Sequence, residues 1–131
     1  MMNVLLVEDN EGDVILMQEA FNENQIEGQL LVARSDTEAK EMIISNLPTL
    51  ILTDMNIPQV GGLEVLNFVK TNDKYRHIPV IVFSSFLPDE QLSRCYSEGA
   101  NGVIIKENGY EKLKKNVENL INYWIKTVIL P

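Results

Sequence analysis

Short runs of consecutive apolar residues alternate along the chain with longer stretches in which apolar residues recur every three or four positions. The apolar runs cover residues 4–7, 30–33, 50–53, 80–83 and 103–105, and each has the length of a buried strand. The longer stretches that follow each run have the period of an amphipathic helix. On the last helix, the expected apolar stripe consists of Leu113, Val117, Leu120, Ile121, Trp124, Ile125 and Val128. The pattern therefore predicts five strand–helix units in succession.

Residues that favour helix starts stand between these segments. The first helix is expected over residues 12–24, with Asp13 in its first turn, and Ser35 or Asp36 can cap the second helix. Five strand–helix units with short connections predict an α/β fold, a doubly wound, five-stranded parallel sheet with five helices and right-handed crossovers. No linker, repeat or low-complexity tract interrupts the pattern, so we expect one domain over residues 1–131.

Composition narrows the possible partners and the compartment. The chain of 131 residues has a net charge of −8, so we expect no DNA-binding surface, which would need clustered positive charge. The single cysteine, Cys95, excludes an internal disulfide and is expected to be a packing thiol in a reducing compartment. No signal peptide precedes the first strand, and no apolar stretch reaches transmembrane length. We therefore expect a cytoplasmic protein that does not enter a membrane.

Polar side chains stand at the C-terminal ends of four predicted strands. They are the acidic pair Glu8 and Asp9, then Asp54, Ser84 and Lys106. Because parallel strands end at one edge of the sheet, where ligands bind in such folds, we expect these side chains to lie close together. Clustered carboxylates need a cation, and their oxygen atoms favour a hard ion such as Mg²⁺. A metal ion and a positioned ammonium together would neutralise the oxygens of a phosphoryl group that a carboxylate accepts.

The order and spacing of these motifs resemble the receiver domain of bacterial two-component response regulators over essentially the whole chain. The matching residues are Val7-Glu8-Asp9, Asp54-Met55-Asn56-Ile57-Pro58, Gly62, the run 79–84 and Lys106. Residues 7–14 and 123–131 resemble most the stand-alone regulators that are paired with bacterial phytochrome kinases. The resemblance implies the flavodoxin-like receiver fold, with strand order 2-1-3-4-5.

The resemblance also implies a role for each residue near the acidic edge. Asp54 would be the phosphoacceptor, taking its phosphoryl group from a sensor histidine kinase. Asp9, Asp54 and the backbone carbonyl of Asn56 would bind Mg²⁺. Glu8, which replaces the commoner Asp of the family, would act on the metal through a bound water. Gly62 would provide the turn before the third helix.

The same resemblance implies how the phosphorylated state is recognised. Lys106 would pair with the aspartyl phosphate, and Ser84 would move toward it as the switch. Ser85 is adjacent, and only the family register favours Ser84. Besides Glu8, two further positions depart from the family pattern: Glu107 stands where a proline is usual, and Val103 stands where many members carry an aromatic switch residue. We therefore expect coupling to run through Ser84 and its loop.

Three other functions compete with a phosphorylated regulator. A receiver that is never phosphorylated would serve only as a docking module. A phosphatase that forms an aspartyl phosphate would need a second acid two residues after its nucleophile, where this chain has Asn56. A flavin or nucleotide carrier would need a glycine-rich loop after the first strand, where this chain has Glu8 and Asp9. The favoured function is a single-domain regulator that signals through protein contacts, without enzymatic turnover of other substrates.

Two apolar features suggest further properties. Phe86 lies two residues beyond Ser84, at a position that borders the phosphoryl group in the family. Its ring would obstruct an attacking water, which predicts a long-lived phosphorylated form. Residues 128–131 extend the apolar stripe of the last helix, and exposed contiguous apolar surface often marks an interface. We therefore expect a homodimer through the last helix and tail, unless the tail folds back on its own domain.

Overall fold

The computed structural model describes residues 2–57 and 61–131, and within them the strands form one parallel sheet. The strands are β1 (Met2–Val7), β2 (Gly28–Ala33), β3 (Leu50–Thr53), β4 (Val80–Ser84) and β5 (Gly102–Ile105). Their order is β2-β1-β3-β4-β5, which confirms the predicted fold and strand order. Pro58, part of the motif that follows Asp54, lies outside the described residues.

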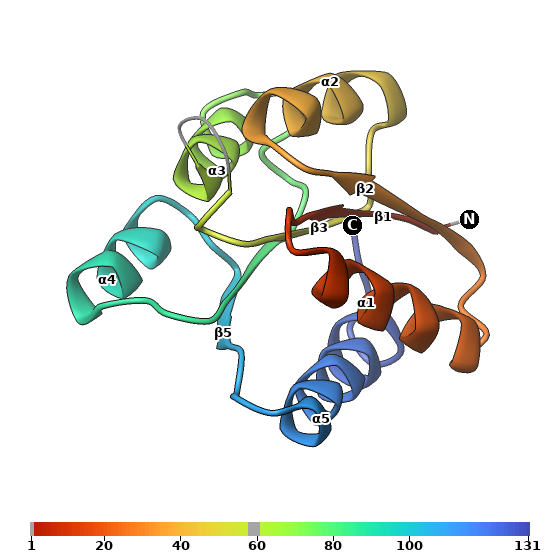
Figure 1. Ribbon diagram of the computed structural model, residues 1–131. Helices are drawn as coiled ribbons and strands as arrows, with labels where there is room; N and C mark the ends of the chain where they lie inside the picture. Colours follow the sequence, from red (N-terminus) through yellow and green to blue (C-terminus); the bar gives the residue numbers. More distant parts are fainter. Residues whose placement is uncertain (1, 58–60) are drawn as a thin grey trace.

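Helices connect the strands and cover both faces of the sheet (Figure 1). They are α1 (Glu11–Glu23), α2 (Asp36–Asn46), α3 (Gly62–Lys70), α4 (Asp89–Ser97) and α5 (Tyr110–Leu120). Helices α2, α3 and α4 contribute to the core on one face, and α1 and α5 to the core on the other. In the described part of the chain, none of the helices has the length and apolar character that crossing a bilayer requires.

Each central strand contributes side chains to both cores, because successive side chains of a strand point to opposite faces of the sheet. In β1, Leu5 and Val7 belong to the α2–α3–α4 core, whereas Val4 and Leu6 belong to the α1–α5 core. The same alternation runs through β3 and β4. Burial on both faces explains why these strands read as continuous apolar runs in the sequence.

Polar and glycine residues fix the helix starts near the acidic edge. The Asn10 side chain accepts a hydrogen bond from the backbone N–H of Asp13 at 3.0 Å, and so caps α1. Ser35, one of the two expected candidates, caps α2. The turn before α3 depends on Gly61, whose φ is +105°, and not on Gly62 as expected. Gly62 is needed for a different reason: a Cβ there would collide with the carbonyl oxygen of Asp54.

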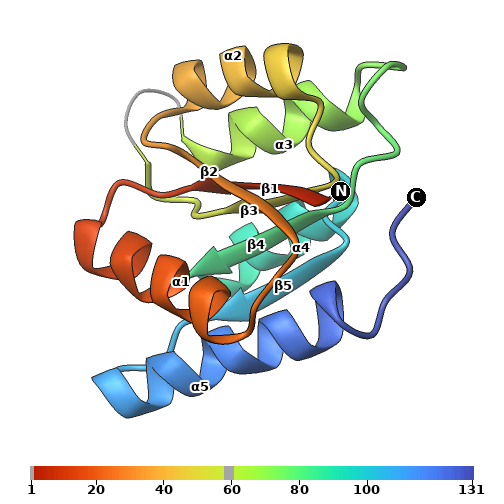
Figure 2. The ribbon, with the colours of Figure 1, turned by 90° about the vertical axis from the view of Figure 1, so that its right-hand side faces the viewer.

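The end of the chain differs from the prediction. The α-helix stops at Leu120 and continues as a π-helical turn, η1 (Ile121–Ile125), so Val128 lies outside the helix. After η1 the chain turns away from the helix axis (Figure 2). Leu130 is half-buried and packs against the α1–α5 core, whereas Ile129 is 95% exposed. The tail therefore folds back in part on its own domain.

Candidate functional site

Four of the predicted site residues are buried together at the C-terminal edge of the sheet. Glu8 follows β1, Asp54 follows β3, Ser84 ends β4 and Lys106 follows β5. Each is at most 7% exposed, although all carry polar or charged groups. Buried polar groups need partners, and these residues are partners of one another.

The ammonium group of Lys106 lies between three carboxylates. Its Nζ donates hydrogen bonds to Glu8 Oε1 at 2.5 Å, to Asp54 Oδ2 at 2.8 Å and to Asp13 Oδ2 at 2.8 Å. These bonds use all three N–H donors of a lysine. Sequence reasoning placed Asp13 in the first helical turn but missed this contact, because its partner lies 93 positions away.

The two oxygens of Asp54 have different partners. Oδ1 accepts hydrogen bonds from the backbone N–H of Asn56 at 2.8 Å and from the Ser84 hydroxyl at 3.0 Å. Oδ2 accepts only the bond from Lys106 among the bonds found in the described residues. Ser85 is exposed, so it is Ser84 that faces the carboxylate. The arrangement fixes the carboxylate plane and leaves Oδ2 the less encumbered oxygen.

Burial and hydrogen bonding act in opposite directions on these groups. Burial disfavours the charged form of Glu8 and, despite the neighbouring ammonium, raises its pKa to about 7. Asp54 is buried as well, but the N–H of Asn56 and the side chains of Lys106 and Ser84 outweigh burial and lower its pKa. Burial also opposes the charge of Lys106, yet its bonds to three carboxylates raise its pKa. At neutral pH Asp54 is therefore ionised beside a charged lysine.

The oxygen-rich edge fits a hard divalent cation in its donor chemistry. Glu8 and Asp54 contact the same ammonium, so they are close enough to share one cation. Asp9 is exposed and takes no part in the ion pairs of Lys106. Across residues 2–57 and 61–131, no three His, Cys, Asp or Glu side chains are arranged to hold a metal together. The ammonium takes the position between the carboxylates instead.

Val103, at the position of the family's aromatic switch residue, and Phe86, the expected shield of the phosphoryl group, have different surroundings. Val103 is half-buried in β5, and its backbone N–H donates to the hydroxyl of Tyr96 on α4 at 3.2 Å. An aromatic side chain thus lies beside this strand although β5 itself supplies none there. Phe86, in the loop after β4, is 72% exposed. The peptide bond between Lys106 and Glu107 is trans.

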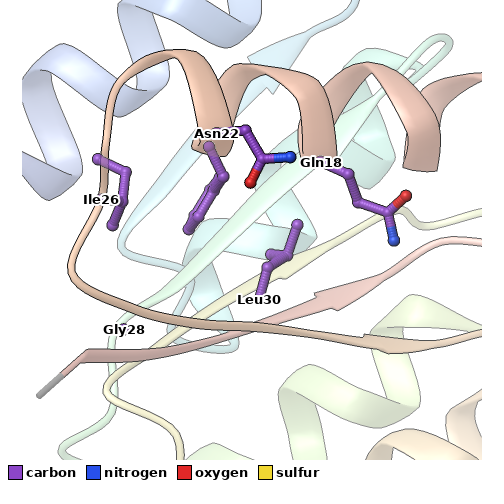
Figure 3. Close-up of a pocket in the computed structure, with 6 residues that line it drawn as sticks. Gln18, Asn22, Ile26, Gly28 and Leu30 are labelled. Carbon is purple, nitrogen blue, oxygen red and sulfur yellow. The ribbon is translucent and has the colours of Figure 1, made fainter.

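A pocket of about 360 Å³ lies away from this edge. Side chains from α1, the following turn and β2 surround it (Figure 3), and its lining is Gln18, Phe21, Asn22, Ile26, Gly28 and Leu30. Gly28 begins β2, so the pocket lies toward the N-terminal ends of the strands. None of the lining side chains is charged or nucleophilic, and the pocket is therefore not the candidate site.

Comparison with known proteins agrees with the geometry. The family model "Response regulator receiver domain" matches residues 4–118. The probable methanogenesis regulatory protein FilR2 of Methanothrix harundinacea is 34% identical over 128 residues, which cover 93% of this chain and 83% of FilR2. The response regulator Rcp1 of Synechocystis sp. is 31% identical over 135 residues, which cover 98% of this chain and 92% of Rcp1.

Solved structures give the same picture. The crystal structure of Mn²⁺-bound Rcp1 superposes with a TM-score of 0.94 at 30% identity, covering 100% of this chain and 99% of that one. The phosphorylated cyanobacterial phytochrome response regulator RcpA superposes with a TM-score of 0.93 at 30% identity. The superposition covers 99% of this chain and 98% of RcpA. The predicted likeness to regulators of bacterial phytochromes is thereby confirmed.

Proposed function

Because the chain belongs to the response regulator receiver family, we propose that it accepts a phosphoryl group on Asp54 from a sensor histidine kinase. The observation that carries the proposal is the unequal hydrogen bonding of the two Asp54 carboxylate oxygens. Among the described residues, Oδ1 accepts bonds from two donors, whereas Oδ2 accepts a bond only from the ammonium of Lys106. An ionised oxygen beside a fixed positive charge is suited to attack an electrophilic phosphorus.

In the proposed step, Asp54 Oδ2 forms a bond to phosphorus. The bond from phosphorus to the donor breaks, and its electron pair leaves with the donor, a histidine nitrogen in the kinase. Oδ2 then becomes the bridging oxygen of an acyl phosphate, so the Lys106 N–H that faced it turns to a phosphoryl oxygen. Before the transfer the Ser84 hydroxyl donates a hydrogen bond to Oδ1. In the proposed phosphorylated state it also turns to a phosphoryl oxygen, and this movement shifts the loop after β4.

The proposed cofactor is Mg²⁺, held by Asp9, Asp54 and the backbone carbonyl of Asn56, with Glu8 acting through a water. Support comes from the hard oxygen donors at this edge and from the Mn²⁺-bound form of the relative Rcp1. When bound, such an ion neutralises negative charge on the transferring oxygens. The lowered pKa of Asp54 keeps its carboxylate available to the metal and to phosphorus.

The proposed partner is a histidine kinase of the phytochrome type, as the name of the relative RcpA suggests. We propose that residues 1–131 act as one receiver domain, whose output is a change in protein contacts and not contact with DNA or a membrane. Receivers of this family generally signal and do not catalyse turnover of other substrates. The proposal places the protein in the cytoplasm, where a buried, unpaired Cys95 is expected.

A homodimer through η1 and the tail is part of the proposal. Its support is the exposure of two large apolar side chains there: Tyr123 is 57% exposed and Ile129 is 95% exposed. We expect the double change Tyr123→Ser and Ile129→Ser to lower the solution mass in sedimentation experiments. Ile44→Ser removes a similarly exposed apolar side chain from α2 and should leave the mass unchanged. Equal masses for all three proteins would contradict the dimer.

Phosphorylation is tested by incubating the protein with Mg²⁺ and acetyl phosphate and measuring its intact mass. We expect the wild type to gain one phosphoryl group and Asp54→Asn to gain none. Removing the metal with EDTA should abolish the adduct. A wild type without an adduct would leave a docking module as the better function, and sustained hydrolysis of added phosphoesters would favour a phosphatase.

A further inference from the structure

One of the three partners of Lys106 comes from a helix and not from a strand end. Glu8 and Asp54 follow β1 and β3, whereas Asp13 lies in the first turn of α1. We propose that Asp13 is a positioning residue that holds the Lys106 ammonium in place while Asp54 is phosphorylated. This inference rests on the proposed function and adds to it a residue outside the set that the family resemblance implies.

The position of Asp13 is fixed independently of the lysine. The Asn10 side chain accepts a hydrogen bond from the Asp13 backbone N–H at 3.0 Å, which anchors the start of α1. Val14 and Met17, which follow Asp13 on the inward face of the helix, are almost fully buried in the α1–α5 core. The Asp13 carboxylate is 21% exposed and reaches inward to a lysine side chain that is 5% exposed. A rigid helix start thus carries this carboxylate.

Phosphorylation changes the other two partners of the ammonium but not Asp13. The oxygen Asp54 Oδ2 becomes a bridging oxygen, so the bond from Lys106 must move to a phosphoryl oxygen. Glu8 is proposed to contact the water of a metal ion and can weaken its bond to the lysine. Asp13 is neither phosphorylated nor proposed to contact the metal, so it can keep its bond to Lys106 throughout. A flexible lysine stem with one constant anchor stays close to the productive geometry.

Asp13 also has an effect of the opposite sign on substrate binding. Its negative charge repels an anionic phosphodonor, as do the neighbouring carboxylates. Replacing Asp13 by Asn therefore should weaken positioning while easing the approach of the donor. The two effects fall on different kinetic constants: positioning affects the maximal rate, and repulsion affects the donor concentration at half-maximal rate. A merely structural role would not separate them in this way.

The test compares phosphorylation rates of Asp13→Asn, Asp13→Glu and a matched control, using acetyl phosphate at saturating Mg²⁺. Glu11→Gln is the control, because it removes the same charge from the same helical turn, where Glu11 pairs with Arg34 and not with Lys106. We expect Asp13→Asn to lower the maximal rate about 10-fold without raising the half-saturating donor concentration. Glu11→Gln should stay near wild type, and Asp13→Glu should recover part of the loss.

Two outcomes are distinguishable. If the wild type is phosphorylated and Asp13→Asn matches Glu11→Gln in maximal rate, the positioning role is wrong while the proposed function stands. If the wild type gains no phosphoryl group, the proposed function itself fails. Should Asp13→Asn not fold, as judged by circular dichroism, Asp13→Ser, which removes the charge with a shorter side chain, gives the same comparison at this partly exposed position.

Discussion

Two buried carboxylates at neighbouring strand ends have pKa values shifted in opposite directions. Glu8 accepts bonds from Lys106 and, at 3.3 Å, from the backbone N–H of Asn10, and burial raises its pKa to about 7. Asp54 accepts three bonds, from Asn56, Ser84 and Lys106, which lower its pKa in spite of burial. Asp54, the proposed phosphoacceptor, is thus ionised at neutral pH, whereas burial favours the neutral form of Glu8. Two carboxylates whose pKa values differ in this way can take different roles in one reaction.

A single methyl group at Gly62 should disturb both stability and the site. In Gly62→Ala the new Cβ would collide with the carbonyl oxygen of Asp54, so backbone must shift. We expect the free energy of unfolding in urea to fall by about 2 kcal/mol, and phosphorylation of Asp54 to slow. Gly12→Ala is the control, because its Cβ would meet only the side-chain oxygen of Asn10, at 3.3 Å. It should change stability by no more than about 1 kcal/mol.

The exposed ring of Phe86 should govern how long the phosphoryl group lasts. Its side chain is 72% exposed and contributes little to the core, so Phe86→Ala should leave stability unchanged. We expect the variant to lose its phosphoryl group several-fold faster than wild type, because a water reaches the phosphorus more easily. Phe86→Leu retains bulk and should lie between the two. The measurement is the decay of the phosphorylated mass after removal of the donor, and equal decay rates would contradict shielding.

At the scale of elements, the sequence pattern predicted the order of the strands and α-helices that the structure describes, but neither the π-helical turn η1 nor all of the element ends. The central strands can be recognised in the sequence as continuous apolar runs, because both faces of each strand are buried. At the edge strand β2 the structure adds Gly28 and Gln29, which are exposed and carry no apolar signal. The last α-helix stops at Leu120, where the chain continues as the π-helical turn η1, although the apolar period that predicted the helix runs on to Val128.

Two of the apolar side chains of the tail, Ile129 and Leu130, can be tested separately. Leu130 packs against the α1–α5 core, whereas Ile129 is 95% exposed. We expect Leu130→Ser to lower the free energy of unfolding by about 1 kcal/mol, since a half-buried apolar side chain is lost. Ile129→Ser should leave the monomer's stability unchanged. Urea unfolding at low protein concentration measures both, and equal effects would show that the tail does not pack as described.

At the scale of the whole molecule, the site was predictable as far as the topology of a parallel sheet dictates. Strand ends at one edge brought Glu8, Asp54, Ser84 and Lys106 together, as their spacing indicated. The third partner of the lysine was not predictable in this way. Asp13 reaches the site because α1 begins beside the end of β1, and no sequence period records a contact between residues 93 positions apart.

The integrity of the whole fold can be followed through its single thiol. Cys95 is 0% exposed in the α2–α3–α4 core, and burial, together with the charge of Glu98, raises its pKa. Because the thiolate is the reactive form, we expect iodoacetamide at pH 8 to label the native protein at least about 10³-fold more slowly than the urea-unfolded protein.

Labelling should also report on the stability changes predicted above. The native rate should rise with pH toward the ordinary pKa of an exposed thiol, because burial and Glu98 raise the pKa only in the closed state and the reactive thiolate forms in each opening event. If the core opens only by global unfolding, Gly62→Ala should label faster by the factor by which its lost free energy of unfolding raises the unfolding equilibrium constant, and Gly12→Ala should not. Equal labelling of the two variants would instead indicate that α4 opens on its own, without global unfolding.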